Sequence, residues 1–441
     1  MSHKSALYIG SLELGRIFHM IDYDLLQLFR PADKVMEKLN RADFANVRHY
    51  RDWYCADYEE KYFARLALRC SAKVAKDRLD LIGVTLEAAE ARFEEALRIK
   101  MEYDRTQTRT RETTSLSLDL DLWLDHFRRL WNIHCSHSTV ADPLPEHECP
   151  LSDYECSPFR YYGFPGLTTD VDNTNRLHLL RLVMEQVPPD AYLSYELGDM
   201  IEHNYDADRF DEDIAALVHH IDGHLQYGLT KTTVITEGIS DKECLERSLG
   251  ILHPHLVDYY HFFEFEMGGI EGGAAQLAKV VKAFAAAGVQ RPVVAFFDND
   301  TAGRDAHESL KTFPMPDNIA VRRYPDLELA RNYPALHTNG TIQKMNVNGY
   351  AGSIEIYFGE DILAHTCQLE PVEWKPYTGN VKGKQGVLRN KGKLQKAFKK
   401  KLKAGERNPH AIRPHEWQDM DGILDTLRTA FHSVGGPETL T

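Results

Sequence analysis

The sequence predicts an α+β multidomain protein. We expect a mainly helical N-terminal region over residues 1–228, an α/β domain with a parallel sheet over residues 229–368, and a basic C-terminal segment over residues 369–441. Helical periodicity in the first half, a strand–helix alternation that begins near Thr230, and a concentration of Lys and Arg after Lys375 carry this prediction. A chain of 441 residues is also long for one hydrophobic core and suggests two or three domains.

The N-terminal region opens with an extended run at residues 6–10. Apolar residues at three-to-four spacing, set among Ala, Glu, Leu and Arg, then predict helices, because these residues have high helix propensity. The expected helices are residues 59–74, 86–101, 116–133, 177–187 and 211–228.

Short apolar runs and helix-like segments alternate in the second part. The expected strands are residues 232–236, 259–265, 292–297 and 320–324, and the expected helices are 241–249, 274–287 and 302–311. Such alternation with short links is typical of a parallel sheet with helical crossovers. Ser240 followed by Glu243 has the spacing of a capping box, which predicts that the first of these helices begins just after Ser240.

Carboxylates follow two of these strands directly. Glu237 ends the first strand, and Asp298 and Asp300 end the third. The carboxyl ends of parallel strands meet at one edge of a sheet, where ligands bind in open α/β folds. Carboxylates gathered there repel one another unless a hard cation lies between them. The sequence therefore predicts a divalent cation held against a phosphate.

The two strings Glu237-Gly238-x-x-Asp241 and Asp298-x-Asp300-x-x-Gly303 resemble the Toprim domain, a Rossmann-like catalytic module, over residues 230–365. The resemblance implies that Glu237 acts as general acid/base or metal ligand and that Asp298 and Asp300 hold Mg²⁺ or Mn²⁺. It also implies further metal ligands in Asp241 and in Glu355 of Gly352-Ser353-Ile354-Glu355. The chain has no P-loop and no zinc ribbon, and little length for a strand-passage gate, so the resemblance narrows to Toprim domains of nuclease type.

A helical region before a Toprim domain resembles the HEPN/Toprim-associated proteins of bacterial conflict systems. Arg129 and His134 fit the R-x₄₋₆-H hallmark of HEPN ribonucleases. Five positions along a helix place two side chains about 140° apart, which suits a site shared across a homodimer better than one within a chain. The alternative is an ordinary surface helix.

The formal charge of −14 is unevenly distributed, since residues from Lys375 to Arg407 include twelve Lys and Arg but one acid, Glu406. Contact with nucleic-acid phosphates is one interpretation, and a solvated basic segment is the other. The residues that we expect to contact phosphate are Lys382, Lys384, Arg389, Lys391 and Lys393.

Together these features predict a Mg²⁺-dependent nuclease that cleaves DNA or RNA in a conflict or antiphage defence system, with or without a partner protein. A non-catalytic nucleic-acid-binding or regulatory subunit, and a HEPN-type ribonuclease whose Toprim half is a sensor, are the alternatives. Seven cysteines with no C-x-x-C pair, and no membrane-spanning stretch, predict a cytoplasmic location without membrane contact.

Overall fold

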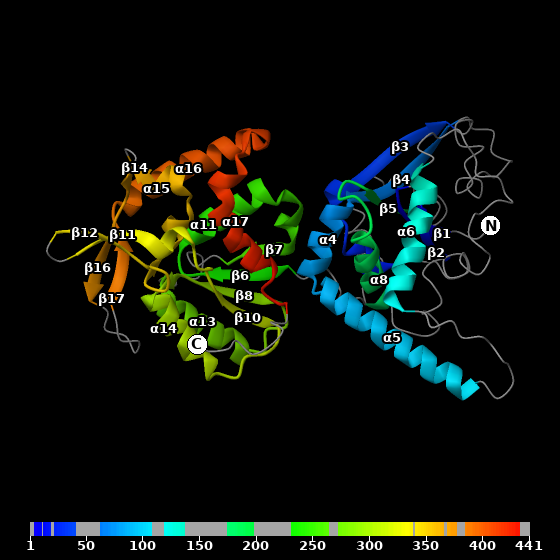
Figure 1. Ribbon diagram of the computed structural model, residues 1–441, viewed down its shortest axis with the longest axis horizontal. Helices are drawn as coiled ribbons and strands as arrows, with labels where there is room; N and C mark the ends of the chain where they lie inside the picture. The colour runs from blue at the N-terminus through cyan, green and yellow to red at the C-terminus, as the bar shows by residue number, and fades with distance from the viewer. Residues whose placement is uncertain are drawn as a thin grey trace. The chain divides into compact units, whose positions relative to one another are not determined.

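The computed structural model describes residues 4–10, 12–18, 22–40, 62–107, 119–136, 174–197, 231–263, 272–337, 340–365, 368–376 and 384–432. Internal contacts divide the chain into two compact units, Met1–Gly228 and Leu229–Thr441 (Figure 1). The helix expected at residues 211–228 lies outside the described residues.

The first unit is built on an antiparallel five-stranded sheet, in the order β2-β1-β5-β4-β3. Its strands are β1 (Lys4–Ile9), β2 (Leu12–Phe18), β3 (Lys34–Asn40), β4 (Tyr62–Ser71) and β5 (Tyr192–Glu196). The extended run at residues 6–10 is confirmed as β1. The prediction that the N-terminal region is mainly helical is wrong, because this sheet forms its centre.

β4 shows why the helical prediction failed. Its segment is rich in Ala, Leu and Arg, which favour a helix in isolation, so we expected a helix over residues 59–74. In the fold, however, β4 pairs with β3 along its first seven residues and with β5 along its last five. The helix begins only after Ser71, whose side chain accepts the N–H of Val74. Long-range strand pairing therefore overrides the local propensity.

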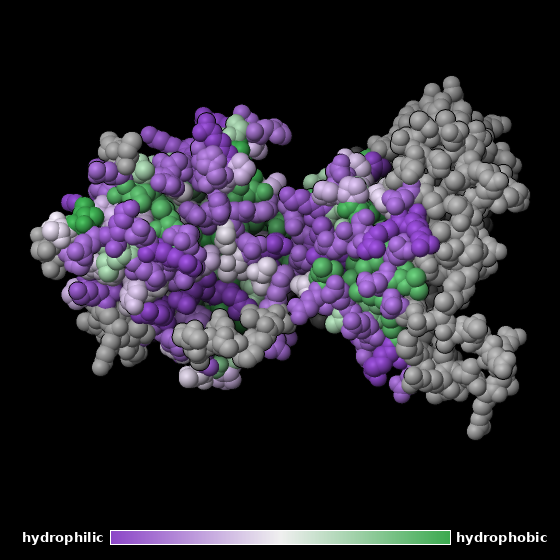
Figure 2. Space-filling model, in the orientation of Figure 1, coloured by the Kyte–Doolittle hydropathy of each residue, from purple (hydrophilic) through white to green (hydrophobic). Residues whose placement is uncertain are grey.

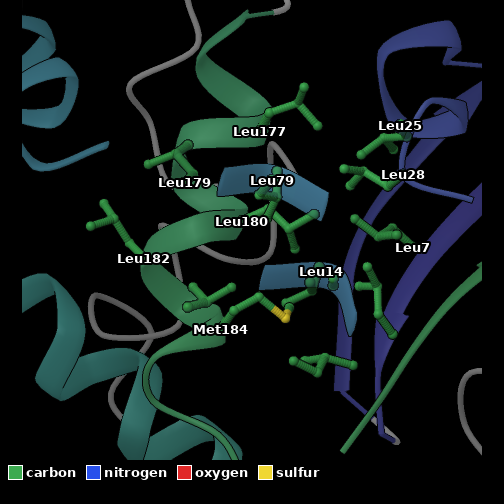
Figure 3. Packing of buried hydrophobic residues seen from close by; sticks show 14 of the residues in the cluster. Leu7, Leu14, Leu25, Leu28, Leu79, Leu177, Leu179, Leu180, Leu182 and Met184 are labelled. Carbon is green, nitrogen blue, oxygen red and sulfur yellow. The ribbon is translucent and has the colours of Figure 1, made fainter. Parts of the chain in front are cut away.

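The helices of the first unit supply the other wall of its core. They are α1 (Tyr23–Leu26), η1 (Pro31–Asp33), α4 (Ala72–Leu81), α5 (Leu86–Gln107), α6 (Leu120–Ser136) and α8 (Thr174–Met184). The last three confirm expected helices. Figure 3 shows Leu180 and Met184 of α8 pointing toward Leu7 and Leu14 of the sheet, and all four belong to one buried cluster.

The second unit contains the expected parallel sheet, in the order β10-β8-β6-β7. Its strands are β6 (Thr232–Thr236), β7 (Tyr260–Phe262), β8 (Val293–Phe297) and β10 (Ile319–Arg323). Its crossover segments are α11 (Ile239–Leu252), η3 (Pro254–Tyr259), α13 (Ala274–Ala286) and α14 (Thr301–Lys311). The capping box is wrong: α11 starts two residues earlier, with Gly238 as its N-cap, so Ser240 lies inside the first turn.

Further strands and helices complete the second unit. A second sheet has the order β12-β11-β16-β17. The remaining elements are β9 (Asn299–Asp300), η4 (Leu329–Asn332), β11 (Tyr333–Leu336), β12 (Ile342–Met345), β13 (Ala351–Gly352), η5 (Ile354–Tyr357), α15 (Glu360–Leu363), β14 (Ala364–His365), β15 (Gln368–Leu369), β16 (Val372–Pro376), β17 (Lys384–Leu388), α16 (Lys391–Arg407), η6 (Pro409–Ala411) and α17 (Pro414–Arg428).

The basic helix α16 is packed into this unit. The Phe398 ring is fully buried and stacks on Phe358, the residue that follows η5, with ring centroids 4.0 Å apart and planes 2° from parallel. It also contacts Trp417 of α17. Lys401 donates from Nζ to the carbonyls of Phe358 and Glu416 at 3.0 and 2.6 Å. The described part of the basic C-terminal segment is therefore ordered structure, anchored at its helix.

Among the described helices, none combines the length and the apolar character that crossing a lipid bilayer requires.

Candidate active site

Glu237 and Asp298 meet at the carboxyl ends of neighbouring strands. β6 and β8 are parallel and paired, so the residues that follow them lie side by side. Glu237 Oε1 accepts the backbone N–H of Asp298 at 2.9 Å. A Cβ on Gly303 would lie 2.2 Å from the Asp298 carbonyl oxygen and 3.1 Å from Glu237 Oε1. Glycine at position 303 therefore allows α14 to begin directly against both residues.

Asp241 and Asp300 lie at the starts of two helices beside this pair. Asp241 is buried in the first turn of α11. Asp300 is the N-cap of α14, where its Oδ1 accepts the N–H of Gly303 at 2.8 Å. Gln385 of β17 donates to the other oxygen of Asp300 and accepts the N–H of Ala302. A residue 85 positions away in sequence therefore orients this carboxylate.

Glu355 reaches the same edge of the sheet through a short strand pair. β9, which contains Asp300, is antiparallel to β13, and η5 follows β13 directly. Three donors contact the buried Glu355 carboxylate: Ser353 Oγ at 2.7 Å, Gln395 Nε2 at 2.8 Å and Lys391 Nζ at 3.0 Å. Both of its oxygens therefore have protein partners. We call Glu237, Asp241, Asp298, Asp300 and Glu355 the carboxylate cluster.

The direction of the pKa shift distinguishes Glu355 from the other four carboxylates: its pKa is lowered, and theirs are raised. Burial raises the pKa of Glu237 from 4.5 to about 8, with added repulsion from Asp300 and Asp241. Burial and the charge of Glu355 raise the pKa of Asp241 from 3.8 to about 7. The pKa of Asp298 and that of Asp300 are raised as well, again by burial first. A carboxyl group with a raised pKa is one whose negative charge lacks compensation.

Lys391 supplies the compensation for Glu355. Burial would raise the pKa of Glu355, but Lys391, Ser353 and Gln395 together lower it. Burial likewise opposes the charge of Lys391, yet Glu355, Asp298 and Asp241 raise its pKa. We expected Lys391 to contact nucleic-acid phosphate, whereas it lies against the carboxylate cluster.

The donor set suits a hard divalent cation. Carboxylate oxygens are the ligands that Mg²⁺ prefers, and Asp298 Oδ1 is buried without a hydrogen-bond partner among the described residues. Within those residues, no three His, Cys, Asp or Glu side chains already surround one metal position. Mg²⁺ does not need such a cage, because it usually binds one or two carboxylates and takes its other ligands from water and substrate phosphates. The residues present therefore fit the metal.

A pH-dependent stabilisation by Mg²⁺ is the expected consequence. The raised pKa values of Glu237 and Asp241 mean that the metal-free folded state keeps protons that the unfolded chain releases above about pH 4. The stabilisation from both groups is complete below that pH and is lost as the pH rises toward about 8. Since a metal binds only ionised ligands, Mg²⁺ should raise the melting temperature more at about pH 8.5 than at about pH 5.5.

Differential scanning fluorimetry of the full chain, with MgCl₂ or with EDTA, measures this difference. The Glu237→Gln variant is the control, because its side chain cannot ionise, and its metal-free melting temperature should depend less on pH. An equal Mg²⁺ effect at both pH values would contradict the assignment of these carboxylates as metal ligands.

The other basic residues that we expected to contact nucleic-acid phosphate have different surroundings from Lys391. Arg389 pairs with Glu373 at 3.2 Å, and Lys384 and Lys393 are exposed. Lys382 lies outside the described residues. Sequence reasoning missed Gln385 and Gln395, which hold Asp300 and Glu355 of the cluster. No sequence motif marks them, because elements far apart in the chain bring them to the site.

The R-x₄-H pair lies on α6 of the first unit. Arg129 is exposed and pairs with Asp125, one turn earlier, at 2.8 Å. The backbone of His134 belongs to the same helix, and its side chain lies outside the described structure.

Comparison with known proteins gives one family match. The model of the HEPN/Toprim N-terminal domain 1 matches residues 1–217. No curated protein and no solved structure matches the chain.

Proposed function

Because residues 1–217 belong to the HEPN/Toprim N-terminal domain 1 family, we propose that the unit that follows is a Toprim domain of nuclease type. It would cleave phosphodiester bonds of nucleic acid with Mg²⁺ or Mn²⁺. The observation that carries this proposal is the carboxylate cluster at the carboxyl ends of β6 and β8, in which the buried Asp298 Oδ1 has no partner among the described residues.

The side chains of the cluster and their partners would have different roles in such a reaction. Asp298, Asp300 and Asp241 would hold the metal, which neutralises charge on the phosphoryl oxygens when bound. Glu237 would ligate the metal or move a proton, because a pKa of about 8 is close to the working pH of a general acid or base. Lys391 and Gln395 position Glu355 at the edge of the cluster. Gln385 orients Asp300.

Incubation of the purified chain with plasmid DNA and with RNA tests the proposal. Cleavage should need MgCl₂ or MnCl₂, stop with EDTA, and persist in the His134→Ala variant. No cleavage of either substrate with either metal would contradict a nuclease that acts alone. Loss of cleavage in the His134→Ala variant would instead make the first unit the ribonuclease and the second its sensor.

We further propose a role in a bacterial conflict or antiphage system. This step rests on the combination of the N-terminal family with a Toprim-like second unit. Phage plaque counts on a bacterial host that expresses the chain should fall, and an Asp298→Asn variant should restore them. Equal plaque counts with and without the chain, for a panel of phages, would contradict this role.

A further inference from the structure

The seven basic residues of α16 that follow Lys391 fall into two groups. Two of them have partners within the second unit: Lys399 pairs with Glu243 at 2.6 Å, and Lys401 pairs with Asp361 at 2.8 Å. The other five have no ion pair within 4.0 Å among the described residues, and all five are exposed. These five, which we call the cationic stripe, are Lys393, Lys396, Lys400, Lys403 and Arg407.

The stripe occupies one face of the helix. Its members are three or four positions apart, so at 3.6 residues per turn they lie within an arc of roughly 80°. The buried residues of α16 lie on the opposite face: Leu394, Phe398, Leu402 and Gly405. With a rise of about 1.5 Å per residue, the stripe is ~21 Å long. Figure 2 shows mostly hydrophilic surface over this part of the second unit.

A row of charges of one sign along this face does not stabilise the helix itself. Like charges three or four residues apart repel and destabilise a helix, whereas a face that only keeps a protein in solution mixes both signs. The one acid in α16, Glu406, lies on the flank toward α11 and pairs there with Arg247 at 2.7 Å. The five stripe residues therefore have no ion-pair partner within 4.0 Å among the described residues, and an extended anion outside the chain would complement them.

The stripe begins at the same end of α16 as the contacts to the carboxylate cluster. Lys391 and Gln395, in the first turn and a half of α16, both contact Glu355. Lys393 lies between them in sequence and opens the stripe. The stripe therefore starts at the end of α16 that holds Glu355, but its first residue lies roughly 160° round the helix from the two residues that contact this carboxylate.

We propose that the cationic stripe binds the sugar–phosphate backbone of a nucleic-acid strand. This inference rests on the proposed function and specifies its substrate class as polynucleotides long enough to cover about 21 Å along the stripe. Lys and Arg contacts to phosphate carry no base information, so binding is independent of sequence. Mononucleotides and dinucleotides are too short to cover the stripe.

The salt dependence of binding tests the stripe directly. Fluorescence anisotropy of labelled 20-nucleotide single strands and duplexes is measured with the full chain in EDTA, so that no cleavage is needed. Five phosphate contacts predict a slope of log Kobs against log[salt] of about −3.5 for single strands and about −4.5 for duplexes. The Lys396→Gln/Lys400→Gln/Lys403→Gln variant should reduce the slope to about −1.4 and −1.8, respectively. A labelled dinucleotide should bind at least tenfold more weakly than the 20-mer.

A matched triple variant controls for net charge. Lys73, Lys279 and Lys344 are exposed and have no ion pair among the described residues, and their change to Gln removes the same three charges. This control should bind like the wild type. Equal slopes in the stripe variant and the wild type, or no binding of any polynucleotide, would overturn the inference. Binding through the stripe without cleavage in Mg²⁺ would contradict only the nuclease activity, and cleavage unaffected by the stripe variant would contradict only the stripe.

Discussion

The Asp298→Asn substitution is expected to abolish metal-dependent cleavage and to raise the melting temperature of the metal-free protein at alkaline pH. The substitution keeps the shape of the side chain but removes a charge next to Glu237, Asp241 and Asp300. Activity should fall by roughly 10²–10³-fold or more, as it does when a group that stabilises transition-state charge is lost. Stability should rise, because the folded state of the metal-free wild type contains mutually repelling carboxylates.

The opposite signs of these two effects distinguish a functional cluster from a structural one. About 1 kcal/mol of relieved repulsion corresponds to ~2–4 °C in melting temperature for a unit of this size. Nuclease assays with MgCl₂ and thermal melts in EDTA at about pH 8.5 measure both effects. A variant that melts below the wild type would show that Asp298 mainly stabilises the fold.

Asp317→Asn is the matched control for this experiment. Asp317 is exposed in the same unit, before β10, and the substitution is chemically identical. Surface substitutions of this kind usually change stability by less than about 0.5 kcal/mol. Both activity and melting temperature should therefore stay close to the wild type.

The Phe398→Ala substitution is expected to destabilise the second unit by about 3–5 kcal/mol. Phe398 is fully buried between Phe358 and Trp417, so the loss of its ring leaves a cavity at the junction of η5, α16 and α17. Urea unfolding measured by Trp fluorescence and far-UV circular dichroism gives the change in free energy. The effect should extend to the carboxylate cluster, because α16 also carries the Lys391 and Gln395 contacts to Glu355.

An alanine at Lys400 of the same helix separates packing from helix propensity. Lys400 is exposed on the opposite face of α16, and Ala and Lys have similar helix propensities. Stability should change by less than about 0.5 kcal/mol in this variant. If Phe398→Ala were equally mild, α16 would not be anchored by its aromatic face.

The carboxylates could be predicted because their placement depends on local sequence. Glu237 and Asp298 each follow an apolar run directly, and parallel strands bring such ends to one edge of a sheet. The expected strands of this sheet agree with the structure to within a few residues. The start of α11 was less predictable: the spacing of Ser240 and Glu243 fits a capping box, but the helix begins with Gly238 as its cap.

The N-terminal sheet and the surroundings of the cluster could not be predicted in the same way. β4 has the composition of a helix and becomes a strand only through β3 and β5, and β5 lies more than 120 residues after β4. Gln385 and Lys391 reach the cluster through β17 and α16. Such contacts depend on closing long loops, which single-sequence periodicity does not report.

The sequence by itself determined which carboxylates lie at the strand ends, because a strand followed by carboxylates and then a helix is a local pattern. Only the tertiary structure determined which groups the charged side chains of the basic segment contact. Lys391 compensates the buried Glu355, Lys401 joins α16 to α17, and Lys393 remains exposed at the start of the cationic stripe. These lysines are equivalent in sequence. Burial and the neighbouring carboxylates, which only the fold supplies, make them different.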